Sequence, residues 1–249
     1  MLKINDLNLY YGNTQALKNF NLCIDEGTIY SVLGPSGCGK TSLINILAGN
    51  IKHFTGELFS DGAKLNYKKQ TIGLISQDYG LLPWLTVYKN IVLPLKIKKL
   101  NIRDYREKIT YVMESLGISE LKDRYPGSLS GGQKQRAAIA SAFILDLELL
   151  LMDEPFSALD QVSREGTQEL FFRVWKKSRP TTLFATHSVE EAVFLGQKIV
   201  ILSNAPGSVL DIANNPTFGH SEVRLSREYS DFCLDIRRLI KDKWTSGEV

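Results

Sequence analysis

One glycine-rich segment has the residue types and the spacing of a phosphate-binding loop. Residues 34–41 read Gly-Pro-Ser-Gly-Cys-Gly-Lys-Thr, which matches G-x-x-x-x-G-K-[ST]. The glycines let backbone N–H groups curl around phosphates, and Lys40 can reach the β- and γ-phosphates of ATP. The Thr41 hydroxyl can coordinate Mg²⁺. The predicted nucleotide contacts are Gly34, Pro35, Ser36, Gly37, Cys38, Gly39, Lys40, Thr41 and Ser42.

Two adjacent carboxylates form a second group that could do chemistry. Residues 149–152 read as a buried strand, which ends at Asp153, Glu154 and Pro155. Carboxylates at the C-terminal end of a strand lie where open α/β sheets bind ligands. A polar turn closed by proline would be the better interpretation alone, but the phosphate loop in the same chain reverses that preference. We expect Asp153 to bind Mg²⁺ through water and Glu154 to polarise the attacking water.

A third group, Leu129-Ser-Gly-Gly-Gln133, precedes a helix predicted over residues 134–145. Ser130 and Gln133 have the S-x-x-Q spacing of a capping box, so an ordinary helix start is one interpretation. Two glycines are poor helix formers, however, and favour a place where the backbone must approach another molecule closely. The chain would then carry a second anion-binding helix N-terminus, without a lysine like that of the first.

Alternating strands and helices must position these groups. Apolar residues alternate over residues 2–9 and 20–24, and residues 30–33 read as a buried strand before the phosphate loop. A helix over residues 42–48 follows and is stopped by Gly49. The later pattern is strand, helix, strand, helix, strand over residues 149–152, 163–177, 182–185, 189–195 and 199–202. This order predicts an α/β fold with a parallel sheet and helices on its faces.

A helical region interrupts this α/β pattern between about residues 87 and 145. Four apolar residues there share one helical face: Ile109, Val112, Met113 and Leu116. A last amphipathic helix is predicted from Phe232, Ile236, Leu239 and Ile240.

Bulk properties exclude several classes of protein. The 249 residues fit one large or two small domains, and 43% hydrophobic with 23% charged residues is ordinary globular usage. A net charge of +3, scattered along the chain, does not indicate a nucleic-acid partner. The three cysteines have no metal or disulfide spacing. The start has no signal-peptide pattern, and no apolar run would span a bilayer, so a membrane role would require a partner.

Together, these segments resemble the ATP-binding cassette (ABC) family over essentially the whole chain, in the family's order. Tyr11 looks like the aromatic that stacks on adenine, and Gln77 like the Q-loop residue. Residues 129–133 resemble the signature motif, residues 157–160 the D-loop, and residues 186–187 the H-loop. A lone tyrosine or histidine is usually structural, but this order makes coincidence negligible. The resemblance implies an ATPase.

The resemblance also implies roles for single residues. The implied catalytic residues are Glu154, His187, Gln77 and Lys40, and the implied Mg²⁺ ligands are Thr41, Gln77 and Asp153. Further ATP contacts come from Tyr11, Ser130, Gly131, Gly132, Gln133 and Asp160. In the family two cassettes pair head to tail, so the signature motif of one caps the ATP of the other. Cys38 is tolerated in the loop, and Ser188 stands where the family usually has Asp.

The domain organisation implied is one ABC ATPase domain over residues 1–249, with a P-loop NTPase core and a mainly parallel sheet. Residues 1–77 and 147–215 would form this core with an N-terminal antiparallel β subdomain. Residues 78–146 would form an inserted helical subdomain, and residues 216–249 a C-terminal tail with a helix.

The segment from Gln77 to Asn90 indicates the branch of the family. Leu81-Leu-Pro-Trp-Leu-Thr-Val87 looks like the nitrate, sulfonate and taurine importer group, as does the turn Ser203-Asn-Ala-Pro-Gly207. In importers this segment faces a membrane-spanning permease subunit, although Trp84 could also be a core residue. The implied partners are a second copy of the chain, the permease and, indirectly, a solute-binding protein. The chain would be peripheral at the cytoplasmic face of the cell membrane, with no large regulatory domain after the tail.

Two classes of protein are alternatives to an importer ATPase. A soluble cassette acting on ribosomes or DNA usually carries two cassettes or a long coiled-coil insertion, and this chain has neither. A P-loop small-molecule kinase would not need residues 129–133 or His187 at these places.

Overall fold

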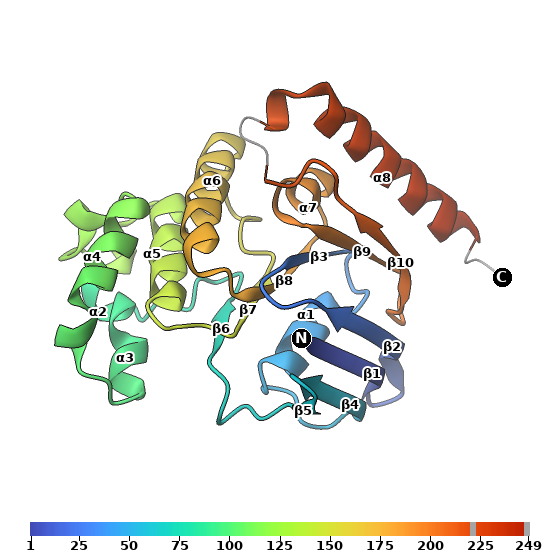
Figure 1. Cartoon of the computed structure of the whole chain (residues 1–249), viewed down its shortest axis with the longest axis horizontal. Helices are drawn as coiled ribbons and strands as arrows, with labels where there is room; N and C mark the ends of the chain where they lie inside the picture. Colours follow the sequence, from blue (N-terminus) through green and yellow to red (C-terminus); the bar gives the residue numbers. More distant parts are fainter. Residues whose placement is uncertain (220–222, 247–249) are drawn as a thin grey trace. The chain divides into compact units, whose positions relative to one another are not determined.

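The computed structural model describes residues 1–219 and 223–246, which form two compact units (Figure 1). Unit 1 comprises residues 1–70 and 181–249, and unit 2 comprises residues 71–180. The phosphate loop and His187 belong to unit 1, whereas the acid pair and the signature segment belong to unit 2. The predicted boundaries of the helical subdomain, 78 and 146, stay a prediction. Residues 220–222 and 247–249 of the predicted tail lie outside the described residues.

An antiparallel sheet begins unit 1, in the order β2-β1-β4-β5. The strands are β1 (Leu2–Tyr11), β2 (Thr14–Ile24), β4 (Thr55–Ser60) and β5 (Ala63–Lys64). Ile4 and Leu7 are three residues apart, yet both are buried, because a register shift separates them. Asp6 lies within that shift with φ +47°. A bulge of this kind returns the apolar side chains to one face, which explains the imperfect alternation of the sequence.

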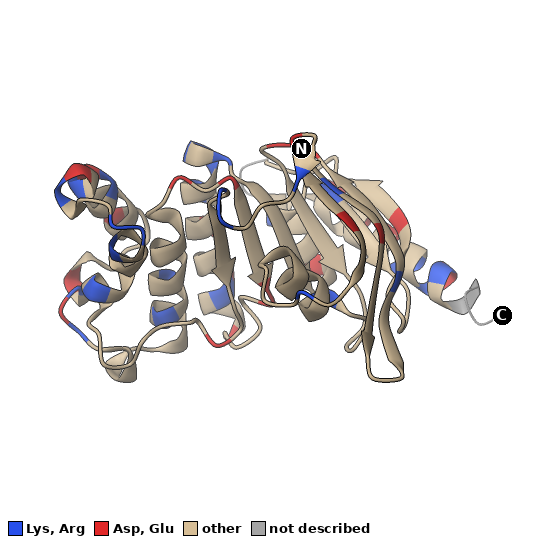
Figure 2. Cartoon of the chain, turned by 90° about the horizontal axis from the view of Figure 1, so that it is seen from below, with Lys and Arg blue, Asp and Glu red and all other residues tan. Residues whose placement is uncertain are grey.

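The parallel strands of unit 1 carry the functional loops. β3 (Ile29–Leu33) lies between β8 (Thr181–Thr186) and β9 (Lys198–Leu202) and is parallel to both. β10 (Val209–Asn214) adds to β9 in the antiparallel sense. β3 and β8 contain no charged residue, as buried parallel strands require, and the strands in Figure 2 are correspondingly mostly tan. Helices α1 (Lys40–Leu47) and α7 (Val189–Leu195) follow β3 and β8.

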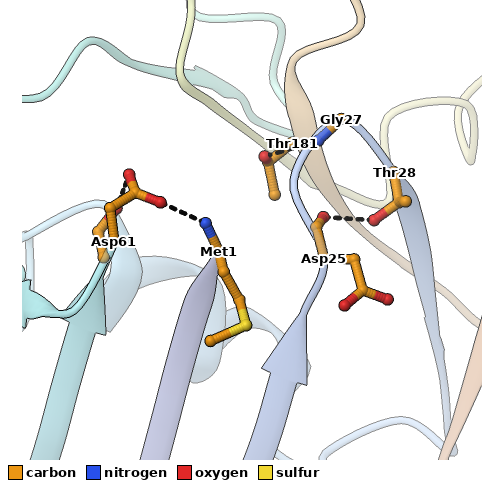
Figure 3. Close-up of polar contacts among 7 residues, drawn as sticks. Met1, Asp25, Gly27, Thr28, Asp61 and Thr181 are labelled. Atoms are coloured by element: carbon orange, nitrogen blue, oxygen red, sulfur yellow. Dashed lines mark hydrogen bonds and ion pairs between the residues drawn. The ribbon is translucent and has the colours of Figure 1, made fainter.

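Short polar contacts fix the ends of these strands (Figure 3). The backbone N–H of Gly27 donates to Thr181 Oγ1 over 3.1 Å, which ties the turn before β3 to the start of β8. The Thr28 hydroxyl donates to the backbone carbonyl of Asp25 in the same turn. At the other sheet, the N-terminal amine of Met1 pairs with Asp61. The bond between Gly27 and Thr181 thus joins the N-terminal ends of β3 and β8, and the functional loops leave from the opposite ends of these strands.

The last helix, α8 (Arg227–Ser246), follows a short 3₁₀ turn at Val223–Leu225. Its apolar face packs in one cluster with α7 and β9, through Tyr229, Cys233, Ile236 and Ile240. The predicted amphipathic helix is therefore confirmed, and it belongs to the core of unit 1.

Unit 2 is mostly helical. Its two strands, β6 (Ile72–Ile75) and β7 (Leu149–Asp153), are parallel to each other. The helices are α2 (Val87–Ile91), α3 (Leu93–Ile97), α4 (Arg106–Ser115), α5 (Gly131–Phe143) and α6 (Gln161–Ser178), with 3₁₀ turns at Ile102–Tyr105, Ser119–Leu121 and Pro126–Ser128. Phe171 meets Phe143 and Phe156 edge to face, with ring centroids 5.9 and 6.3 Å apart.

The predicted fold class is confirmed. The structure contains the parallel strands with their helices, the N-terminal antiparallel sheet and the inserted helical segment. Within the residues that the structure describes, none of the helices has the length and apolar character needed to cross a membrane.

Candidate nucleotide site

The phosphate loop connects β3 to α1 through backbone that only glycine adopts easily. Gly37 and Gly39 have φ of +82° and +94°. A Cβ on Gly39 would lie 2.7 Å from the carbonyl oxygen of Ala16 and 2.7 Å from Leu17 Cδ2. Gly39 is therefore required both by its conformation and by its contact with β2. Since α1 begins at Lys40, the loop ends at a helix N-terminus, where anions are stabilised.

Lys40 is the buried cation of this loop, with only 5% of its surface exposed. Its ammonium group donates to the carbonyl oxygens of Gly34, over 2.8 Å, and Pro35, over 2.9 Å. These bonds hold the charge inside the curve of the loop. A phosphate group bound there would gain a charge-assisted hydrogen bond from Lys40.

Two further predicted residues lie at the first turn of α1. Thr41 is exposed, and the Tyr11 hydroxyl is 3.2 Å from Ser42 Oγ. Tyr11 is 49% exposed, so its ring is accessible beside the loop. The structure thus brings the predicted aromatic residue and the phosphate loop together within unit 1.

His187 is exposed at the end of β8, and its neighbours are fixed on both sides. The Thr186 hydroxyl donates to the buried carboxylate of Glu191 over 2.6 Å, and the backbone N–H of Ser188 donates to Thr186 Oγ1. Ser188 Oγ accepts from the backbone N–H of Glu191, which makes Ser188 the N-cap of α7. An Asp would cap in the same way, so the exchange for Ser preserves the local structure.

Glu191 is a residue of this site that the sequence analysis missed. It is 6% exposed and anchors the hydroxyl beside His187. The spacing Ser188-x-x-Glu191 is that of a capping box and could have identified the start of α7.

In unit 2, the acid pair lies at the C-terminal end of β7: Asp153 is the last residue of the strand, and Glu154 follows it on strained backbone. Glu154 has φ +44°, a left-handed conformation that costs a residue with a side chain about 1–3 kcal/mol. Ser157 stabilises this turn, because its hydroxyl and its backbone N–H donate to the carbonyl oxygen of Glu154 over 2.8 and 3.2 Å. Such strain gathers at functional sites, where the surrounding structure forces a side chain into one direction.

The signature segment forms the capping box that its spacing predicts. The backbone N–H of Gln133 donates to Ser130 Oγ over 3.3 Å, and the backbone N–H of Ser130 donates to Gln133 Oε1 over 3.0 Å. A Cβ on Gly131 would meet the Tyr79 hydroxyl at 3.3 Å, which is tight, whereas one on Gly132 would meet Ser163 at an ordinary 3.6 Å. The fold of unit 2 therefore accommodates a Cβ at Gly132 without a clash.

The other two predicted residues of unit 2 lie on exposed turns. Asp160 is the N-cap of α6 and accepts from the backbone N–H of Ser163 over 3.0 Å. Hydrogen bonds from Ser163, first from its side chain and then from its backbone, hold the pKa of the Asp160 carboxyl below its usual range. Gln77 is exposed two residues after β6.

The predicted donors suit Mg²⁺ chemically. Thr41 offers a hydroxyl, Asp153 a carboxylate and Gln77 an amide oxygen, and oxygen ligands are those that hard divalent cations prefer. Magnesium sites commonly combine one or two carboxylates with substrate phosphates. A predicted donor set with a single carboxylate is chemically compatible with that pattern.

Comparisons with known proteins show the family of the chain. The model of the family described as ABC transporter matches residues 17–157. The aliphatic sulfonates import ATP-binding protein of Bacillus cereus (strain ZK / E33L) is 37% identical over 218 residues, which cover 86% of this chain and 86% of that protein. The taurine import ATP-binding protein of Shigella boydii serotype 4 (strain Sb227) is 38% identical over 211 residues, with coverage of 85% and 83%.

A solved structure is similar over most of its length. It is a dimeric ATP-binding cassette in a post-hydrolysis state with bound ADP and Pi. It superposes with a TM-score of 0.74 at 29% sequence identity and covers 86% of this chain and 98% of that one. The chain therefore belongs to the ABC transporter family, as one of its ATP-hydrolysing cassettes.

Proposed function

We propose that this chain is the ATPase subunit of an importer, which couples hydrolysis of MgATP to the uptake of a small solute of the sulfonate or taurine kind. Its relatives in Bacillus cereus and Shigella boydii carry sulfonate and taurine import in their names. A membrane-spanning permease would bind the chain at the cytoplasmic face of the membrane, and a solute-binding protein would deliver the solute. The alternative is an ABC ATPase that is not linked to transport.

The chemistry proposed assigns one task to each group of residues. The backbone N–H groups of the phosphate loop and Lys40 bind the phosphates, and Tyr11 stacks on the adenine. Glu154 orients and polarises the attacking water, while His187 contacts the γ-phosphate. Thr41, Asp153 and Gln77 would hold Mg²⁺, which neutralises charge on the phosphates when bound.

The second copy of the chain is proposed to complete the site. The room at Gly132 means that unit 2 itself does not explain the glycine there. A nucleotide held by the partner's phosphate loop, approaching the N-terminus of α5, would explain it, since a side chain would obstruct that approach. Dimeric assembly of the similar solved cassette supports this arrangement.

One observation favours a permease partner above all: the exposed and pinned loop that carries Trp84. Trp84 is 69% exposed. The buried side chain of Asn90 accepts from the backbone N–H of Leu82 and donates to the carbonyl oxygens of Leu82, Leu85 and Thr86, over 2.8–3.1 Å. Such bonds fix the backbone on both sides of Trp84, so the indole is presented at little further cost in entropy. Aromatic side chains that become buried when two proteins bind dominate the energy of their interface.

The experiment is co-purification of this chain with its permease after Trp84→Ala. Loss of an aromatic anchor is expected to weaken assembly by about 2 kcal/mol or more, and transport with it. ATP binding by the isolated subunit should not change. Leu225→Ala is the matched control, because Leu225 is 86% exposed in unit 1. Wild-type assembly of the Trp84→Ala chain would reject this interface, and a wild-type chain that no permease retains would favour the alternative function.

A further inference from the structure

The turn between β9 and β10 contacts the phosphate loop, although none of the proposed chemical roles uses it. The turn comprises residues 203–208. The backbone N–H of Gly207 donates to the carbonyl oxygen of Ala16 over 2.9 Å. In return, the backbone N–H of Lys18 donates to the carbonyl oxygen of Gly207 over 3.0 Å. Gly207 therefore pairs with β2 in a short parallel bridge at Leu17.

The same glycine lies directly against the phosphate loop. A Cβ on Gly207 would be 2.0 Å from the carbonyl oxygen of Cys38 and 3.2 Å from its carbonyl carbon. Real Cβ contacts essentially never fall below 3.0 Å, so an added methyl would displace one of the two backbones by about 1 Å. Gly207 does not have a positive φ, so lack of space, and not backbone conformation, is what requires glycine there.

We propose that Gly207 is a positioning residue for ATP binding, because it sets the orientation of the peptide between Cys38 and Gly39. This peptide is trans, so the carbonyl of Cys38 and the N–H of Gly39 point in opposite directions in one plane. The carbonyl of Cys38 lies against Gly207, so the N–H of Gly39 points away from Gly207. Backbone N–H groups of this segment are those that a phosphate loop uses.

Other contacts support this role of the turn. A Cβ on Gly34, at the start of the loop, would lie 3.1 Å from Leu202 Cβ, at the end of β9. β9 and its turn therefore touch the phosphate loop near both of its ends. Within the turn, Ser203 Oγ donates to the carbonyl oxygen of Pro206 over 2.9 Å and accepts from the backbone N–H of Ser208 over 2.9 Å. These bonds fix the shape that presents Gly207.

The inference rests on the proposed role of the phosphate loop, and Gly207→Ala tests it. The affinity of the whole chain for MgATP and for MgADP is measured by calorimetry, beside the melting temperature without nucleotide. A misdirected N–H should weaken both affinities by about tenfold or more, the range for a hydrogen bond to a charged group. The KM for ATP should rise more than kcat falls. Gly166→Ala is the control, because Gly166 has open space around it and should keep both affinities.

Two outcomes separate this inference from the proposed function. If the folded Gly207→Ala chain binds ATP as the wild type does, the turn has moved instead of the loop, and the inference is wrong. If the wild-type chain itself binds no ATP, the proposed function fails. Should Gly207→Ala not fold, Ser203→Ala replaces it, since that variant only loosens the turn. A smaller loss of affinity for both nucleotides is then expected, and unchanged affinity overturns the inference.

Discussion

The phosphate loop in unit 1 and the segments of unit 2 that are proposed to act in catalysis differ in how tightly they are packed. Around the loop, backbone lies against backbone with no space for a side chain at Gly39 or Gly207, and Lys40 is held by two carbonyl oxygens. In unit 2, the backbone of Glu154 is strained, and a Cβ would fit at Gly132 without a clash.

A buried glutamine extends this contrast. Gln135, in α5, whose first turn contains the signature glycines, is 0% exposed. Neither its amide nitrogen nor its carbonyl oxygen has a hydrogen-bond partner among the residues that the structure describes. An unsatisfied buried amide destabilises a fold, as strained backbone does. The phosphate loop is thus closely packed at these glycines, whereas the Glu154 turn and Gln135 carry local energetic costs, as expected where function and not stability selects residues.

The largest effect should come from Glu154→Gln, which keeps the shape of the side chain on this strained backbone but removes its charge. Hydrolysis should fall by about 10²-fold or more, the scale of a positioned general base, while ATP binding in unit 1 persists. Phosphate release and nucleotide affinity measure the two, and size-exclusion chromatography should show an ATP-bound dimer. Glu120→Gln, an exposed carboxylate of the same unit, is the control. Near-normal turnover would show that the strain at Glu154 does not serve catalysis.

Lys40→Ala tests how much the buried ammonium group of the phosphate loop contributes to nucleotide affinity. Loss of its charge-assisted hydrogen bond should cost about 1.5–3 kcal/mol of nucleotide affinity, or roughly ten- to a hundredfold. Calorimetry with MgATP measures the loss. Affinity that stays at the wild-type value would contradict the role of the buried ammonium group.

Mixing two inactive variants tests whether the phosphate loop of one chain and the signature segment of a second chain form one ATP site. The Lys40→Ala chain has a defective phosphate loop, and the Ser130→Arg chain has a defective signature segment. Each homodimer would have two broken sites, whereas the mixed dimer has one site with both lesions and one with neither. Hydrolysis, or at least nucleotide binding at the intact site, should reappear in the mixture. Strictly linear dependence of wild-type activity on protein concentration, with no such recovery, would rule out shared sites.

Gln135→Leu tests whether the unsatisfied buried amide of Gln135 lowers the free energy of unfolding. Replacing an unsatisfied amide with an apolar side chain of similar size should stabilise the chain by about 1–3 kcal/mol. The melting temperature should rise by about 2–4 °C for each kcal/mol. A lower melting temperature would show that the amide does have a partner in solution, such as a buried water, and would remove Gln135 from the comparison.

The smallest effect is expected from Trp244→Phe at the end of α8. The indole N–H donates to the carbonyl oxygen of Leu202 over 2.9 Å, and phenylalanine removes that bond together with part of the ring that packs against the α8 cluster. A loss of about 0.5–1.5 kcal/mol in the free energy of unfolding should follow. ATP affinity should stay within twofold, provided that the turn keeps Gly207 in place. Denaturant titration and calorimetry separate the two quantities.

Features that depend on neighbouring residues were predictable from the sequence. The phosphate loop, the capping box at Ser130 and the alternation of strands with helices are written in short stretches of chain, and the structure confirms their elements. The roles of single site residues remain predictions. The left-handed turn at Glu154, the orphan amide of Gln135 and the contact of Gly207 with Cys38 depend on distant segments. No local pattern encodes such contacts, so sequence reasoning could not reach them.

The pairing of β3 with β8 also determines when the ATP site can form during synthesis. Leu33 pairs with Thr186, and all of unit 2 lies between them in the chain. At about 5–20 residues per second, a ribosome needs on the order of 10–30 s to make that stretch. Throughout this interval β3 lacks both of its parallel neighbours, while unit 2 can already close its own contacts. The N-terminal antiparallel sheet can pair early, whereas β3, which precedes the phosphate loop, gains its parallel neighbours only after unit 2 has been made.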